Sequence, residues 1–267
     1  MRVVGLGHGL FAIAVASLAI LMFTFHDFAP MWQSIPAGSP WREAWEYGCA
    51  LLLLAASVGL CFPRTALPST LTIGAYQAVW ALTGVPPILS EPLSVGAWYG
   101  LCEALTSVAG TWILYAALRW QSRGSQMPLA GERAVRAARV LFGLTCIFYG
   151  SSHFTYADYT ASMVPSWLPS RLGFAYFTGL SYIAAGIGIV LGILPRLAAT
   201  LVAIMMSLFG LLVWVPSFFA HPKPSWATPL QNEWSELEVN LFLAAAAWIV
   251  AAGLRGRPWG FSPRSRV

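Results

Sequence analysis

Charged residues are scarce in this sequence. Only 9% of its 267 residues are Asp, Glu, Lys or Arg, whereas 58% are hydrophobic and the mean hydropathy is +0.67. A soluble domain carries about 25% charged residues, so this chain has too little polar surface to cover a globule in water. The net charge of +5 comes from few, scattered residues between apolar runs. This pattern excludes a nucleic-acid-binding surface and leaves membrane topology as the use of the arginines.

Cysteines and metal-ligating motifs are scarce as well. The chain has four cysteines and four histidines, and neither His-x3-His nor Cys-x2-Cys occurs, so no dedicated metal site is predicted. Cys49 and Cys61 lie on one expected helix about 18 Å apart, too far for a disulfide. Cys49 and Cys102 share one side of the membrane, where pairing and simple apolar packing are alternatives. Without a close cysteine pair, a thiol-oxidising enzyme is disfavoured.

Long apolar runs are what the sequence does contain. A helix of roughly 20 residues crosses the hydrocarbon core of a bilayer, and runs that are continuously apolar exclude the alternating strands of a membrane β-barrel. The first run resembles a secretory signal, but its length and its match to a later run favour a retained helix. The expected spans are residues 5–27, 43–62, 68–88, 94–118, 134–155, 172–194, 197–218 and 234–254.

The basic residues predict the orientation. With the N-terminus inside, 12 of the 15 Lys and Arg lie on the inner side, and Arg42, Arg171 and Lys223 lie outside. The positive-inside rule therefore predicts an integral protein of the bacterial inner membrane with both termini in the cytoplasm. The acids lie mostly toward the outer side, which either an outer polar centre or ordinary solvated loops would explain.

The chain also contains an internal repeat. A Pro-x3-Pro-x-Arg turn occurs at residues 36–42 and again 129 residues later at 165–171, and the offset grows to 136 for Trp98 and Trp234. Each half has four expected spans, so both halves enter the membrane in the same sense. We therefore expect an all-α polytopic protein of eight transmembrane helices, arranged as two parallel four-helix bundles. The expected units are a divergent first repeat (1–120), a cytoplasmic linker (121–132), a second repeat (133–255) and a basic cytoplasmic tail (256–267).

The second repeat resembles a known family. The His153-Phe154 ending, the Met-Val-Pro-Ser-Trp-Leu-Pro turn at 163–169, the following glycines and the Arg-Leu-Ala-Ala opening at Arg196 are similar to the DoxX-like family of four-helix membrane proteins. The resemblance covers residues 134–254 well and 5–118 weakly. The family includes a small subunit of a thiosulfate:quinone oxidoreductase and proteins tied to redox maturation. The resemblance therefore implies a four-helix fold, redox chemistry with a quinone, and a membrane or periplasmic redox subunit as partner.

The first half departs from the family pattern. Asp27 follows the histidine, and residues 37–39 replace the Ser-Trp-Leu of the second half. If one half has lost function, it is therefore the first.

Two histidines close helices at matching depth in the two halves. Imidazole titrates near neutral pH, so His26 and His153 are candidates for proton exchange with a quinol. Axial ligation of haem is a less favoured use. The structural alternative is capping, because a cation is favourable near a helix C-terminus. We assign Trp167 and Trp214 with the two histidines to a cofactor pocket.

Four further residues are candidate catalytic groups. Glu103 lies about 7 Å into the membrane core, and an intramembrane carboxyl is a functional-site hypothesis by default. Its alternative role is to fasten helices by hydrogen bonds. Glu238 is the proton site expected in the second half, Arg171 is expected to stabilise a developing anion, and Asp158 is expected to extend a relay from His153. Solvated loop residues are the alternative for Asp158.

These features favour a quinone-linked redox component of the membrane with an outer-face polar pocket. The first alternative is a small-molecule transporter, which parallel repeats suit, although no expected span shows a clear break in its middle. The second alternative is a non-catalytic assembly factor for another membrane subunit. Membrane lipid is a partner in every case, and nucleic acid in none.

Overall fold

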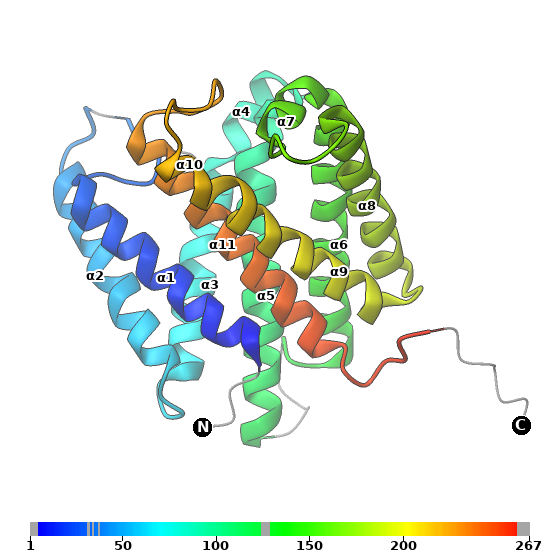
Figure 1. Cartoon of the computed structure of the whole chain (residues 1–267). Coiled ribbons are helices and arrows are strands. Elements are labelled where there is room, and N and C mark those ends of the chain that lie inside the picture. The colour runs from blue at the N-terminus through cyan, green and yellow to red at the C-terminus, as the bar shows by residue number, and fades with distance from the viewer. Residues whose placement is uncertain (1–4, 31–32, 34, 37, 124–128, 261–267) are drawn as a thin grey trace, which may run out of the picture.

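The computed structural model describes residues 5–30, 33, 35–36, 38–123 and 129–260. The described residues are helical and contain no strand (Figure 1). Arg2, residues 124–128 of the expected linker and the tail beyond residue 260 lie outside them. The elements are α1 (Leu6–Phe25), α2 (Arg42–Leu60), α3 (Ala66–Thr83), α4 (Val85–Ser90), α5 (Val95–Arg123), α6 (Glu132–Thr155), α7 (Ala157–Met163), α8 (Arg171–Leu191), α9 (Pro195–Phe209), the π-helix η1 (Gly210–Trp214), α10 (Val215–Phe219) and α11 (Leu230–Gly253).

Six helical segments of the described chain are long and apolar enough to cross a membrane, which confirms the prediction of an all-helical membrane-type chain. They are α1, α2, α5, α8, the continuous run α9–η1–α10, and α11. The two other expected spans, α3 and α6, are not among them. The first turns of α6 carry four charged residues, and α3 carries several hydroxyl and amide side chains within 18 residues. Both α3 and α6 pack along helices that are long and apolar enough to cross a membrane.

The helices pack in chain order and close on themselves. Each long helix packs on the next, α11 returns to pack on α1, and α5 packs against α11 across the middle. In Figure 1, α5 and α11 accordingly lie inside, and α2 and α8 lie on opposite flanks. The spanning segment of α11 is 67% buried, but that of α9–α10 is only 22% buried. The two halves therefore share an interface, with the last helix of each packed on the first helix of the other.

Glycines bring α6 and α8 into close contact. A Cβ on Gly150 would lie 2.6 Å from the carbonyl oxygen of Gly179, and a Cβ on Gly186 would lie 2.6 Å from that of Gly143. The two glycines on each helix are seven residues apart and so share one face. Small residues at these positions let two backbones approach within a membrane. The close approach fixes where the side chains of the C-terminal half of α6 lie against α8.

The continuous helical run α9–η1–α10 is interrupted in its second half. Pro216 has no N–H to donate to a preceding carbonyl, and the turn before it widens into η1, where Val215 donates to the carbonyl of Gly210. The side-chain oxygen of Asn240 would lie 2.7 Å from a Cβ on Gly210, so a larger residue here would displace the Asn240 amide. The sequence predicts no break in the span 197–218, so the π-helix is a correction to that prediction.

Two short helices not expected from the sequence, α4 after α3 and α7 after α6, lie at the end of the molecule opposite the start of α1 and the end of α11 (Figure 1). The expected span 68–88 is in fact α3 followed by α4, because the helix ends at Gly84 ahead of two prolines. The residues of α7 cover one end of the cavity described next.

Candidate functional site

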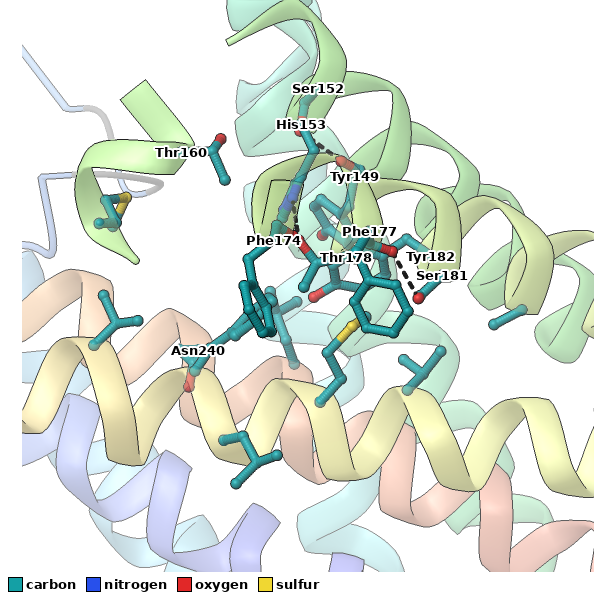
Figure 2. A pocket seen from close by; sticks show the side chains of 18 of the residues that line it. Tyr149, Ser152, His153, Thr160, Phe174, Phe177, Thr178, Ser181, Tyr182 and Asn240 are labelled. Carbon is teal, nitrogen blue, oxygen red and sulfur yellow. Dashed lines mark hydrogen bonds between the residues drawn. The ribbon is translucent and has the colours of Figure 1, made fainter. Parts of the chain in front are cut away.

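The second half of the chain contains a large cavity of about 1260 Å³. Its walls come from α6, α7, α8, α9, η1 and α11, and from α5 of the first half. Figure 2 shows part of this wall, with His153 and Thr178 directed toward each other above Asn240. Drug-sized ligands occupy cavities of roughly 300–1,000 Å³, so this one has room for a larger molecule.

Most of the cavity wall is apolar. α8 contributes Phe177 and Ala184, and α9 contributes Leu201, Leu208 and Phe209. Phe177 is 63% exposed and Leu201 is 55% exposed. The apolar wall is therefore accessible to a ligand, and it follows α8 and α9 for most of their length.

Polar groups gather at the end of the cavity near α7. The described lining residues include two carboxyl groups and one imidazole but no Lys or Arg. This polar end therefore offers acids, a histidine, an amide and phenols, and no permanent cation. The polar lining residues include Tyr99, Glu103, Tyr149, Ser152, His153, Tyr156, Tyr159, Thr160, Thr178, Ser181, Tyr182, Glu236 and Asn240.

The His153 ring is oriented by α8. Its Nδ1 lies 2.9 Å from the hydroxyl oxygen of Thr178 and 3.3 Å from the carbonyl oxygen of Ala175. The carbonyl can only accept, and the Thr178 hydroxyl already donates to the carbonyl of Phe174 at 2.9 Å. We therefore assign the proton of the neutral ring to Nδ1, which leaves Nε2 as the basic nitrogen.

Aromatic rings on α8 and α9 also hold the His153 imidazole in place. Its imidazole stacks on Phe209 of α9 with centroids 6.1 Å apart, and it meets Tyr182 of α8 edge-on at 5.5 Å. The glycine at position 179 lets His153 lie this close to α8, because a Cβ there would come within 2.8 Å of the His153 Cβ. The imidazole is thus held in one orientation by groups from two neighbouring helices.

The two carboxyl groups come from the two central helices. Glu103 of α5 and Glu236 of α11 both line the cavity and interact electrostatically with each other. Tyr149, which also lines it, is held at its hydroxyl by Thr106 of α5 at 2.9 Å. Because α5 belongs to the first half and α11 to the second, this end of the site depends on both.

Tyr159 belongs to α7, outside the spanning helices. Desolvation, and then the charge of Glu236, raise the pKa of its phenol. The phenol therefore remains protonated near neutral pH and is a hydrogen-bond donor at the edge of the cavity.

The cavity includes three of the residues predicted from the sequence, His153, Glu103 and Trp214. Glu238 is buried on α11 but does not line it.

The other predicted residues lie elsewhere. Asp158, Trp167 and Arg171 are exposed on α7, between α7 and α8, and at the start of α8, respectively. His26 contacts the hydroxyl of Tyr47 at 2.8 Å in the first half, so the two histidines do not share this cavity.

Several lining residues were not among those predicted from the sequence. Glu236 of α11 is one of them. Glu233, at the start of the same helix, instead pairs with Lys223 at 3.1 Å. A usable signal was present, because residues four apart share one helix face. Four polar pairs with this spacing line the cavity, Tyr99/Glu103, Tyr149/His153, Thr178/Tyr182 and Glu236/Asn240.

All four cysteines are free thiols in the structure. Cys102 and Cys146 are buried, and Cys49 is partly buried. None of the four lines the cavity, so the site has no thiol chemistry of its own.

Comparison with known proteins identifies one similarity. Residues 141–251 match the model of a domain of unknown function (DUF8561). The matched segment runs from α6 to α11 and contains most of the cavity wall. No curated protein and no solved structure matches the chain.

Proposed function

We propose that this chain is a quinone-binding, redox-associated component of a membrane. The observation that carries the proposal is the cavity of about 1260 Å³ with one polar end and a long apolar wall. An isoprenoid quinone has the same two parts, a polar ring and an apolar chain. The likeness of the second half to the DoxX-like family supports the same ligand class.

The polar end suits a ligand that exchanges protons. Reduction of a quinone to a quinol adds two electrons and two protons, and the reverse reaction releases them. The electrons would pass to or from the membrane or periplasmic redox subunit that the resemblance implies as partner. Nε2 of His153 and the carboxyl groups of Glu103 and Glu236 are the groups that would accept or donate these protons. Since no Lys or Arg is among the described lining residues, an anionic intermediate would have no cation beside it, and proton transfer would have to accompany electron transfer.

This assignment changes some of the roles expected from the sequence. We assign to Glu236 the proton site that Glu238 was expected to provide, because Glu236 lines the cavity. Arg171 and Asp158 are exposed near the cavity's outer end, where they would meet a partner subunit or the aqueous phase. Trp214 remains a wall residue.

We also propose eight spans in two parallel repeats, with both termini on the cytoplasmic side of a bacterial inner membrane. The packing supports this, since α1 packs on α2 and α11, and its counterpart α6 packs on α8 and α5. Such reciprocal contacts are what a pseudo-two-fold axis along the membrane normal would produce. The excess of arginine on one side supports the orientation.

The test is ligand identification followed by mutation. The protein is purified in mild detergent, its lipid extract is analysed by mass spectrometry, and short-chain isoprenoid benzoquinone and naphthoquinone are titrated against its tryptophan fluorescence. We expect Glu103→Gln and Glu236→Gln to weaken quinone binding about threefold to tenfold, the effect of losing one hydrogen bond. Glu91→Gln is the matched control, because Glu91 is exposed and outside the cavity. A protein that retains and binds no quinone would rule out the proposal.

A second function, transport of an amphiphile, is favoured by one observation. The π-helix η1 interrupts a spanning segment beside the cavity, and Leu212, Val213 and Trp214 of this segment line it. Interrupted helices in repeat proteins are typical of transport sites. Ligand flux into proteoliposomes without any change in the redox state of the ligand would favour this function.

A further inference from the structure

Four arginines gather at the end of the molecule opposite the polar end of the cavity. Arg136 and Arg139 lie in the first turns of α6, Arg196 lies in the first turn of α9, and Arg257 follows α11. Figure 1 shows the beginning of α9 and the end of α11 at the same edge of the molecule. A contact joins the two segments, because Arg196 Nη1 donates to the carbonyl oxygen of Arg257 at 3.4 Å.

Arg139 is the central residue of this cluster. The positive charges of Arg257 and Arg136 act on its guanidinium group. Its Nε is buried and has no hydrogen-bond partner within the protein. Neither of the ion pairs found in the described part of the chain involves any of the four arginines. Three mutually repelling cations and a buried donor without a partner are unfavourable unless an anion accompanies them.

Arg196 and Trp259 hold the segment that carries Arg257. The guanidinium carbon of Arg196 lies 4.0 Å from the centre of the Trp259 ring. Together with the bond to the Arg257 carbonyl, this contact fixes residues 254–260 against the start of α9. Arg196 therefore holds the segment of Arg257, whose positive charge acts on Arg139.

Membrane topology alone does not require this arrangement. The positive-inside bias depends on how many basic residues a segment contains, and not on whether their side chains converge. Arg133 in the first turn of α6 contributes to the bias equally, but it is not among the charges that act on Arg139. The convergence therefore needs a separate explanation.

We propose that Arg136, Arg139 and Arg257 form a binding site for an anionic phosphate group, as a phospholipid headgroup presents it at the membrane surface. Guanidinium groups bind phosphate oxygens with paired, charge-assisted hydrogen bonds. The site lies at the ends of spanning helices, where lipid headgroups lie, and basic pockets between such helices suit anionic lipids. It is independent of the cavity, whose described lining residues include no cation.

The experiment counts bound lipid on the full-length protein in detergent by native mass spectrometry. Dioleoylphosphatidylglycerol and dioleoylphosphatidylcholine are titrated separately against the wild type and against Arg139→Gln, Arg257→Gln and Arg133→Gln. We expect the wild type to prefer phosphatidylglycerol, and Arg139→Gln and Arg257→Gln each to weaken its binding about fivefold. This factor corresponds to about 1 kcal/mol per arginine at a membrane surface. Arg133→Gln, with the same charge change on the same helix, should bind like the wild type.

Inorganic phosphate in a competition arm distinguishes the source of the anion. Displacement of phosphatidylglycerol by millimolar phosphate supports a site that recognises the phosphate group alone, and resistance to it supports a site that also binds the rest of the lipid. If Arg139→Gln does not fold, Arg257→Gln carries the test, because residue 257 lies beyond the last helix. Equal binding of the two lipids by the wild type, or an equal loss in Arg133→Gln and Arg139→Gln, overturns the proposal.

Discussion

The Nδ1 of His153 lies 2.9 Å from the hydroxyl oxygen of Thr178, and this hydrogen bond joins α6 to α8 at the wall of the cavity. The two residues are 25 positions apart in the chain. The bond leaves Nε2 as the basic nitrogen of the ring, so it determines which atom of His153 is available to a ligand.

Removal of the Thr178 hydroxyl should release the imidazole. We expect Thr178→Val to weaken quinone binding about threefold to tenfold, because a neutral hydrogen bond contributes roughly 0.5–1.5 kcal/mol. Thr178→Ser keeps the hydroxyl and should restore binding. The measurement is fluorescence titration with a short-chain quinone. If the Thr178→Val and Thr178→Ser variants bind the quinone equally, the hydroxyl does not orient the imidazole ring.

A larger side chain in the apolar wall should exclude the ligand. Ala184 lines the cavity on α8, and Ala184→Phe is expected to reduce the amount of co-purified ligand severalfold by occupying its volume. Ile187→Phe is the matched control, because Ile187 is 43% exposed on the same helix but does not line the cavity. Ligand content is measured by mass spectrometry of the extract. Equal ligand content in the two variants would mean that the ligand lies elsewhere.

The close approach of α6 and α8 predicts a sensitive glycine. A Cβ on Gly179 would lie 2.8 Å from the His153 Cβ and 3.1 Å from the Gly150 carbonyl oxygen. Gly179→Ala should therefore lower the free energy of unfolding by roughly 1–3 kcal/mol, as overpacking does. Gly48→Ala has no atom within 4 Å of the new Cβ and should be neutral or stabilising by up to about 1 kcal/mol. Thermal unfolding in detergent compares the two, and equal midpoints would contradict the close packing.

The pair Lys223–Glu233 predicts a stability effect outside the cavity. Glu233 is 2% exposed and accepts from Lys223 at 3.1 Å, while Lys223 is 44% exposed. Lys223→Met leaves a buried carboxylate without its cation and should destabilise by about 1–2 kcal/mol, less than for a fully buried pair. Adding Glu233→Gln removes that charge and should recover most of the loss. Thermal midpoints of the single and double variants test this, and additive losses would count against the pairing.

The sequence predicted part of the candidate site. His153, Glu103 and Trp214 were singled out and do line the cavity. Arg171 and Asp158 were placed with them because they are near in the chain, but α8 and α7 carry both on exposed faces. Glu236 was passed over in favour of Glu238, two residues away, and in a helix a shift of two residues turns a side chain to another face.

By itself, the sequence determined that the chain forms apolar helices and roughly where they begin and end. Hydropathy, proline and charge act locally, so a single run of residues carries that information. The tertiary structure alone decided that α1 packs on α11, that glycines bring α6 against α8, and that Glu103, His153 and Glu236 share one cavity. In helices that are apolar on nearly every side, hydrophobicity does not mark the buried face, and only the packing of distant small and polar side chains selects it.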